Sequence, residues 1–202
     1  MWWVRRMLSS IRGVSLALVC LGGFLGCGGP QHTTSHRLTS VELRHIHTNE
    51  RLDLQVSAAP HRHDERASFG QHPERIEAFF RDWRSQREHA IHPRLLSCLV
   101  KIAQHFGQPI EIVSAYRSGA RKTSRHRHGK AIDFRVRGVE PQAIWQYAQR
   151  FSQVGLGLYP ASGFVHIDIR RRSYYWIDDS GPGEPSRYRP GVPQPRLSLN
   201  AR

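Results

Sequence analysis

Two short segments constrain this chain more than any other feature of its sequence. Residues 124–133 read S-R-H-R-H-G-K-A-I-D, and residues 164–168 read F-V-H-I-D. Apolar and polar residues alternate from 131 to 136 and again through the second segment, which predicts two half-buried strands. Asp133 then lies opposite its apolar neighbours, and His166 and Asp168 share one face of the second strand. If the strands are neighbours in an antiparallel sheet, His126, Asp133 and His166 converge.

Histidine and aspartate are ligands that suit zinc, and three protein ligands with a fourth position open are typical of a catalytic site. The chain has 13 histidines, so a single one is weak evidence. The combination of His, Gly, Ala and Asp at fixed offsets with a second His in an apolar strand is far more specific. His128 is the rival for the first ligand position, and we interpret it as a solvated residue beside the site.

These residues also carry a family resemblance. The run S-x-H-x-x-G-x-A-x-D, S-A-Y-R-S at 114–118, G-L-G-L-Y-P at 155–160 and F-V-H-I-D together resemble the murein endopeptidase K family. These bacterial zinc peptidases are related to the D-alanyl-D-alanine metallopeptidases. The resemblance covers residues 41–176 and implies that His126, Asp133 and His166 hold zinc in an α+β fold of the hedgehog type. It also implies that Arg117 and Tyr116, in the Y-R-S turn, bind substrate.

Two departures from the family affect the expected chemistry. The loop between 118 and 124 is short, which bears on the shape of the substrate pocket. The related carboxypeptidases carry a glutamate base three positions before the last His, where this chain has Gly163. We expect Asp168 to supply part of the missing chemistry, as a base or by orienting a ligand His, with His128 as the second candidate. The alternative is that Asp168 only pairs with an arginine.

The N-terminus predicts export. Three arginines among residues 1–12 precede an apolar run over 14–26, which is too short for a comfortable membrane span. The run ends in F-L-G-C, typical of a lipoprotein cleavage box, so we expect a signal peptide over 1–26 and lipidation of Cys27. A tether over 27–40, a zinc peptidase domain over 41–179 and a Pro/Gly-rich tail over 180–202 would follow. The tail is expected to wrap the surface or be disordered. This organisation predicts a periplasmic protein anchored to the outer membrane.

The fold class predicted is α+β, with a small antiparallel sheet flanked by about three helices. A hairpin is expected from 41–46 and 52–56, with His45 and His47 on the surface. Helices are expected from Pro73 through Trp83, from Pro93 to a stop at Gly107, and over 141–151. A short strand is expected over 110–113. Cys98 reads as a core residue, and no disulfide is expected within the domain.

The net charge of +14 does not indicate a nucleic-acid binder, because the chain is predicted to be exported and has no nucleic-acid-binding motif. Cell-wall peptides and acidic lipids are better partners. Basic residues crowd just before the first ligand strand, and most are expected to be solvated surface charges. We therefore expect a monomeric, zinc-dependent endopeptidase that hydrolyses peptidoglycan stem-peptide or cross-link bonds. The alternatives are a D-alanyl-D-alanine-type carboxypeptidase and a non-catalytic, zinc-containing wall-binding module.

Overall fold

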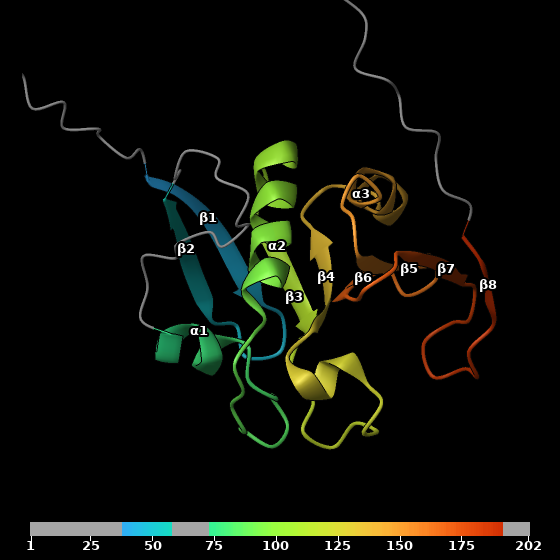
Figure 1. The fold of residues 1–202 in the computed structure, drawn as a ribbon, viewed down its shortest axis with the longest axis horizontal. Helices are drawn as coiled ribbons and strands as arrows, with labels where there is room; N and C mark the ends of the chain where they lie inside the picture. Colours follow the sequence, from blue (N-terminus) through green and yellow to red (C-terminus); the bar gives the residue numbers. More distant parts are fainter. Residues whose placement is uncertain (1–37, 58–72, 192–202) are drawn as a thin grey trace, which may run out of the picture. The chain divides into compact units, whose positions relative to one another are not determined.

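One eight-stranded sheet organises the part of the chain that the computed structural model describes, residues 38–57 and 73–191. Its strands are β1 (Leu38–His45), β2 (Arg51–Ser57), β3 (Ile110–Ser114), β4 (Ala131–Val136), β5 (Val154–Tyr159), β6 (Phe164–Ile169), β7 (Tyr174–Asp178) and β8 (Tyr188–Pro190). Three α-helices, α1 (Pro73–Phe79), α2 (Pro93–Phe106) and α3 (Pro141–Ala148), and the 3₁₀ helix η1 (Arg125–His128) accompany it. Figure 1 shows their arrangement. The α+β class is confirmed.

The sheet is mixed, with the order β2-β1-β3-β4-β6-β5-β7-β8. Most neighbouring strands are antiparallel, but β1 pairs with β3, and β5 with β7, in parallel. The prediction of a small antiparallel sheet was therefore wrong in both size and pairing. The sequence did not mark β5 as a strand because two glycines, Gly155 and Gly157, interrupt its apolar run.

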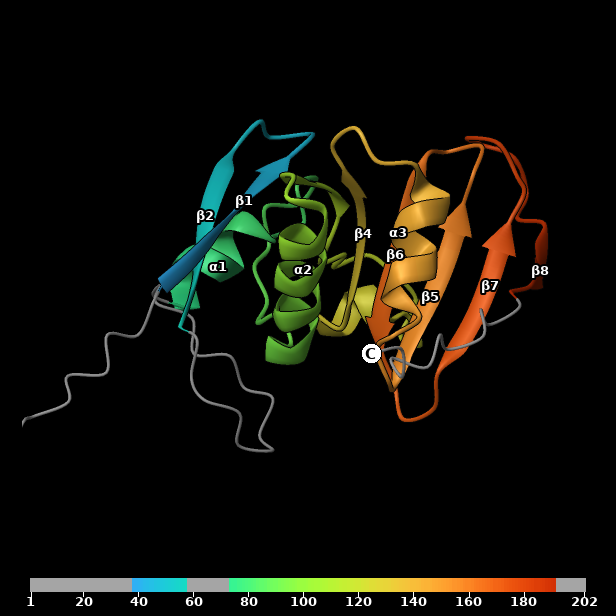
Figure 2. The same ribbon diagram turned by 90° about the horizontal axis from the view of Figure 1, so that it is seen from above.

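Helices α2 and α3 cover one face of the sheet, as Figure 2 shows. Helix α2 has Pro93 in its first turn and ends at Gly107, which adopts the left-handed conformation with φ of 63°. Its apolar stripe packs on the core side of β4 and β6, where the side chains of Ile132, Phe134, Val165 and Ile167 are fully buried. Burial of these alternate residues turns the polar residues of β4 and β6 toward the opposite face.

The predicted hairpin is confirmed as β1–β2, with Leu43 opposite Leu52, but one of its residues was misplaced. His45 is 1% exposed instead of lying on the surface. Its Nδ1 accepts hydrogen bonds from two backbone N–H groups of the turn, at 3.3 and 3.4 Å, and its ring packs edge-on against Phe79. Burial, assisted by the charge of His47, lowers the pKa of His45 to about 4. This packing comes from helix α1, so the pattern of the hairpin alone could not predict that His45 is buried.

Two predicted helices are shorter than expected. Helix α1 ends at Phe79 instead of continuing to Trp83, because Asp82 bonds to the backbone N–H of Arg84 and of Ser118 and closes a turn there. Helix α3 ends at Ala148.

Part of the predicted tail belongs to the sheet, because β8 pairs with β7. The last three residues of the predicted tether, 38–40, belong to β1. The signal segment, residues 27–37 of the tether with Cys27, and residues 192–202 of the tail lie outside the described residues. None of the helices in the described ranges is long and apolar enough to cross a membrane.

Candidate metal centre

The three predicted ligands meet at one point on the polar face of the sheet. Asp133 in β4 and His166 in β6 are direct partners across the antiparallel pair, and His126 comes from η1. One ligand atom from each residue lies within 4.8 Å of the others. His166 Nδ1 is 2.7 Å from Asp133 Oδ1, and His126 Nε2 is 3.3 Å from His166 Nδ1. All three side chains are buried, so the cluster is shielded from bulk water.

Gly129 explains how η1 delivers His126. It adopts φ of 60°, and its backbone N–H closes the 3₁₀ turn on the carbonyl groups of Arg125 and His126. A Cβ atom at this position would lie 2.0 Å from the carbonyl oxygen of Ala90, so a side chain has no room. The Gly129 carbonyl also accepts from the backbone N–H of His92 at 2.9 Å. Glycine thus fixes the turn against the segment before α2.

Hydrogen bonds on the outer nitrogens select the tautomers of both histidines. His126 Nδ1 lies 2.7 Å from the carbonyl oxygen of Ala115, which can only accept, so Nδ1 carries the proton. His166 Nε2 lies 3.1 Å from Asp168 Oδ2, which assigns the proton to Nε2 in the same way. The lone pairs of His126 Nε2 and His166 Nδ1 therefore face Asp133. Two oriented imidazole nitrogens and one carboxylate form a donor set that fits zinc.

The electrostatics keep Asp133 ionised. Burial alone would raise the pKa of Asp133, but the charges and hydrogen bonds of His126 and His166 outweigh it and hold that pKa well below the usual value. Burial alone would lower the pKa of His166, and its bonds to Asp133 and Asp168 raise it overall. A metal ion bound here would replace the protons shared among these groups, because it requires an ionised carboxylate and neutral imidazoles as ligands.

Asp168 is 1% exposed and lies next to the cluster on the same face of β6. Its Oδ1 accepts from Arg170 Nε at 2.7 Å and lies 3.1 Å from Arg125 Nε, while its Oδ2 is the partner of His166. Burial would raise the pKa of Asp168, but His166 and Arg170 lower it to about 2. Asp168 therefore contacts both a ligand histidine and arginines, which are the partners that the two alternatives name.

Three further site residues were predicted, Arg117, Tyr116 and His128, and of these Arg117 contacts a candidate ligand. Arg117 donates to Ser114 Oγ at 2.7 Å and touches Asp133 with Nη2, while 40% of its side chain stays exposed at the rim. Tyr116 packs edge-on against His89, with ring centroids 4.9 Å apart. His128 is exposed, and its Nε2 contacts the carbonyl oxygen of Lys122 at 2.7 Å. Within the described residues, neither the Tyr116 ring nor His128 makes a polar contact with the three candidate ligands.

An aromatic wall beside the cluster was not predicted from the sequence. The ring of Trp176, in β7, lies 5.2 Å from the ring of His166, and its Nε1 donates to Tyr159 Oη at 3.3 Å. Tyr159 stacks in turn on Phe164 at 4.4 Å. Gly157 makes room for this wall, because a Cβ atom there would lie 2.5 Å from the Trp176 ring. The alternating glycines of β5 could have predicted this wall, because glycine in a strand often marks a face that another group approaches closely, here the Trp176 ring.

Comparisons with known proteins show which sequences this chain is similar to. A family model described as peptidoglycan L,D-endopeptidase MepK matches residues 33–173. The peptidoglycan L,D-endopeptidase MepK of Escherichia coli strain K12 is 29% identical over 180 residues, which cover 81% of this chain and 92% of that protein. A Haemophilus influenzae protein named "Probable peptidoglycan L,D-endopeptidase MepK" is 32% identical over 146 residues, or 63% of this chain and 74% of that protein. No solved structure matches the chain.

Proposed function

Because the chain belongs to the peptidoglycan L,D-endopeptidase MepK family, we propose that it is a zinc-dependent endopeptidase that hydrolyses peptide bonds in peptidoglycan stems or cross-links. The observation that carries the proposal is the convergence of His126, Asp133 and His166, whose ligand atoms lie within 4.8 Å of one another. The substrate class follows the names of the relatives. The buried donor set supports zinc as the metal.

The residues of the site have separate roles in metal binding, substrate binding and the exclusion of water. His126, Asp133 and His166 would hold the ion. Bound zinc supplies a Lewis acid that polarises a carbonyl and makes water more acidic. Arg117 keeps one guanidinium nitrogen on Asp133 while 40% of its side chain faces solvent, so it can donate to an oxygen of the substrate. Trp176 and its aromatic neighbours cover the cluster beside His166 and limit the access of water there.

Asp168 is better suited to positioning than to proton transfer. Both of its oxygens are engaged, by His166 and by two guanidinium groups, and its pKa of about 2 makes it a weak base. We propose that it fixes the tautomer and ring orientation of His166, the role that a carboxylate plays toward many metal-bound histidines. An imidazole can act as a base, but the ring of His128 bonds to the Lys122 carbonyl on the exposed loop.

Localisation rests on the N-terminal sequence. The apolar run that ends at Cys27 supports a lipid anchor, and we propose a periplasmic protein attached to the outer membrane and acting as a monomer. Such an anchor would hold the domain near its insoluble substrate.

The function can be tested with purified protein, peptidoglycan and a chelator. Zinc content and released products are measured for the wild type and for H126A, D133A and H166A, with H128A as the matched control. We expect each ligand variant to lose stoichiometric zinc and turnover together, whereas H128A keeps both. Cleaved stem peptides or cross-links identify an endopeptidase, free D-alanine a carboxypeptidase, and binding without products a wall-binding module. Full activity after exhaustive chelation would refute the metal-dependent proposal.

A further inference from the structure

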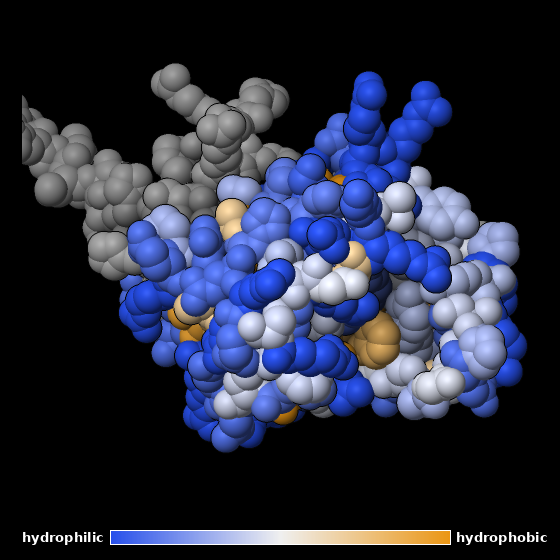
Figure 3. Space-filling model, turned by 90° about the horizontal axis from the view of Figure 1, so that it is seen from below, coloured by the Kyte–Doolittle hydropathy of each residue, from blue (hydrophilic) through white to orange (hydrophobic). Residues whose placement is uncertain are grey.

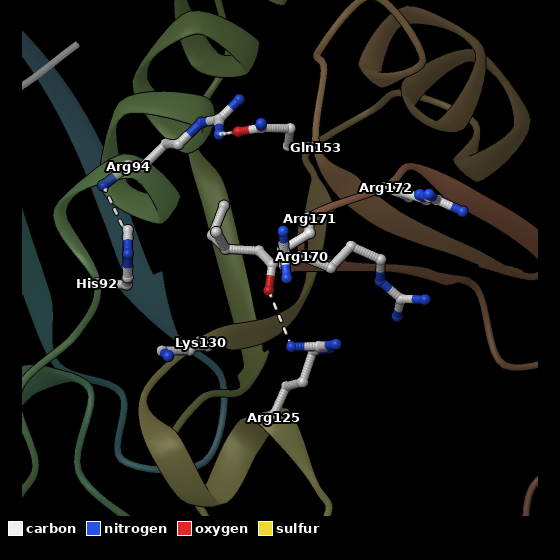
Figure 4. A pocket seen from close by; sticks show the side chains of 9 residues that line it. His92, Arg94, Arg125, Lys130, Gln153, Arg170, Arg171 and Arg172 are labelled. Atoms are coloured by element: carbon white, nitrogen blue, oxygen red, sulfur yellow. Dashed lines mark hydrogen bonds between the residues drawn. The ribbon is translucent and has the colours of Figure 1, made fainter. Parts of the chain in front are cut away.

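A second feature, separate from the metal cluster, is a cleft of about 1010 Å³ in which positive side chains gather. We call it the basic cleft. Six of the residues that line it are cationic: Arg94, Arg125, Lys130, Arg170, Arg171 and Arg172. Figure 4 shows these side chains, which come from the start of α2, from η1 and from the ends of strands. The wider face that includes η1 is mostly hydrophilic and is hollowed at one place (Figure 3).

Backbone hydrogen bonds bring the four segments of the basic cleft together. The N–H of Ile169, at the end of β6, donates to the carbonyl of Lys130 at 3.0 Å, and the N–H of Arg170 donates to the carbonyl of Gln153 at 2.9 Å. The N–H of His92 donates to the carbonyl of Gly129 at 2.9 Å, which joins the start of α2 to the end of η1, and the His92 side chain caps α2 by accepting from the N–H of Arg94. The cationic side chains are therefore held close together by the fold. The N-terminus of this 14-residue helix adds a partial positive charge.

Three of the six cations of the basic cleft, Lys130, Arg171 and Arg172, make no ion pair with a described residue. Among the described residues that line it none is acidic. Arg125 and Arg170 reach Asp168, which is buried behind them. The side chains of Lys130, Arg171 and Arg172 are exposed. A concave surface with one sign of charge focuses the electrostatic field and attracts anions.

Asp168 joins the basic cleft to the metal cluster. One of its oxygens contacts Arg125 and Arg170, which line the cleft, and the other accepts from His166. A ligand in the basic cleft would therefore lie next to the arginines that contact Asp168, and Asp168 in turn contacts the candidate metal ligand His166. This arrangement points to a binding subsite for the same molecule, away from the reacting bond.

We propose that the basic cleft binds free carboxylate groups of the peptidoglycan peptides, and this inference rests on the proposed function. Stem peptides carry several carboxylates, and guanidinium groups bind carboxylates through two parallel hydrogen bonds. The recessed shape favours a discrete anionic chain over a flat membrane surface, and the position beside Asp168 favours the substrate over an unrelated ligand. Recognition of carboxylates here selects peptides by charge and places them for cleavage.

The test compares R171Q/R172Q with the charge-matched control R51Q/K101Q. Arg51 and Lys101 are exposed on β2 and α2, so both double variants remove the same charge from the surface. Binding of soluble muropeptides is measured in the presence of a chelator, so that turnover cannot interfere. The same measurement uses muropeptides whose carboxylates have been converted to amides. Vesicles with and without anionic phospholipid form the third arm.

We expect R171Q/R172Q to bind the carboxylate peptides about tenfold more weakly than the control, because two exposed ion pairs to the peptide are lost; tenfold corresponds to about 1.4 kcal/mol. The difference should vanish with the amidated peptides. Equal binding of carboxylate peptides by the two double variants overturns the inference, as does a difference that persists after amidation. A loss confined to anionic vesicles also overturns it and identifies a membrane contact instead. A protein that binds in this way but never cleaves refutes the proposed function and leaves the subsite standing.

Discussion

Replacing Asp168 with asparagine tests how a buried carboxylate acts on the metal centre. The amide presents one acceptor and one donor where the carboxylate presents two acceptors. Because His166 donates to one oxygen and Arg170 donates to both, at least one pair of donors must then face each other. Loss of an outer-sphere partner of this kind typically reduces metal affinity 10- to 100-fold. The uncompensated arginines should cost about 1–3 kcal/mol of unfolding free energy, less than in a fully buried pair because both are partly exposed.

Asp178 provides a matched control for this substitution. It is also 1% exposed, and its Oδ1 accepts from Ser180 and from the N–H of Arg187, so it holds a loop that has no described contact with the metal cluster. D178N should lower the melting temperature by a few degrees with unchanged zinc affinity. D168N should lower the melting temperature and also weaken zinc binding and turnover.

The assay measures three quantities for both variants: the melting temperature without metal, the zinc dissociation constant by competition with a chromophoric chelator, and turnover at saturating zinc. If Asp168 only orients His166, excess zinc should restore much of the turnover of D168N. If it is the general base, turnover stays reduced by about 10²-fold or more even when zinc is saturating. Zinc affinity and turnover that match those of D178N would refute both roles.

Three further predictions concern other parts of the chain. G157A should displace the Trp176 ring, lower turnover and cost about 1–3 kcal/mol of stability, whereas G119A, which has open space around it, should be neutral; unchanged tryptophan fluorescence in G157A would contradict this. His45, with its pKa lowered by burial to about 4, contributes stability that is present above its unfolded pKa of 6.5 and is lost as pH falls toward 4. H45N keeps an acceptor for the turn and removes the titration, so its melting temperature should depend less on pH across that window, and an equal dependence would exclude His45 as the cause. C27A should move the protein from the membrane fraction to the soluble fraction or leave its signal uncut, and unchanged fractionation with unchanged mature mass would count against lipidation.

The metal centre was largely predictable because its information is local. Alternation over 131–136 and 164–168 fixed which residues of β4 and β6 share a face, and the structure has β4 and β6 at Ala131–Val136 and Phe164–Ile169. One condition could not be tested from the sequence, namely that the two strands are neighbours. Their antiparallel pairing, with Asp133 opposite His166, satisfies it.

The errors fall where a residue depends on a distant segment. His45 was assigned to the surface because the hairpin alone gives it no cover, and the cover comes from Phe79 in α1. Strand β7 pairs in parallel with β5, and the local sequence pattern does not predict which strands pair over such a distance. His128, by contrast, was interpreted as a solvated residue beside the site, and it is exposed with its ring on the Lys122 carbonyl; its role as the second candidate base stays a prediction.

The clustering of basic residues around the site also depends on distant segments, so the sequence alone did not predict it. In the sequence, Arg125 and Lys130 belong to a crowded basic stretch, for which a solvated surface is the ordinary reading. The fold places them beside Arg94 and the arginines after β6, so charges from three separate segments share one cleft. Like charges brought together in this way repel each other and reduce stability, and Asp168 offsets only part of that cost. A bound carboxylate would relieve the remainder, so the melting temperature of the folded protein should rise with carboxylate peptides in wild type more than in R171Q/R172Q.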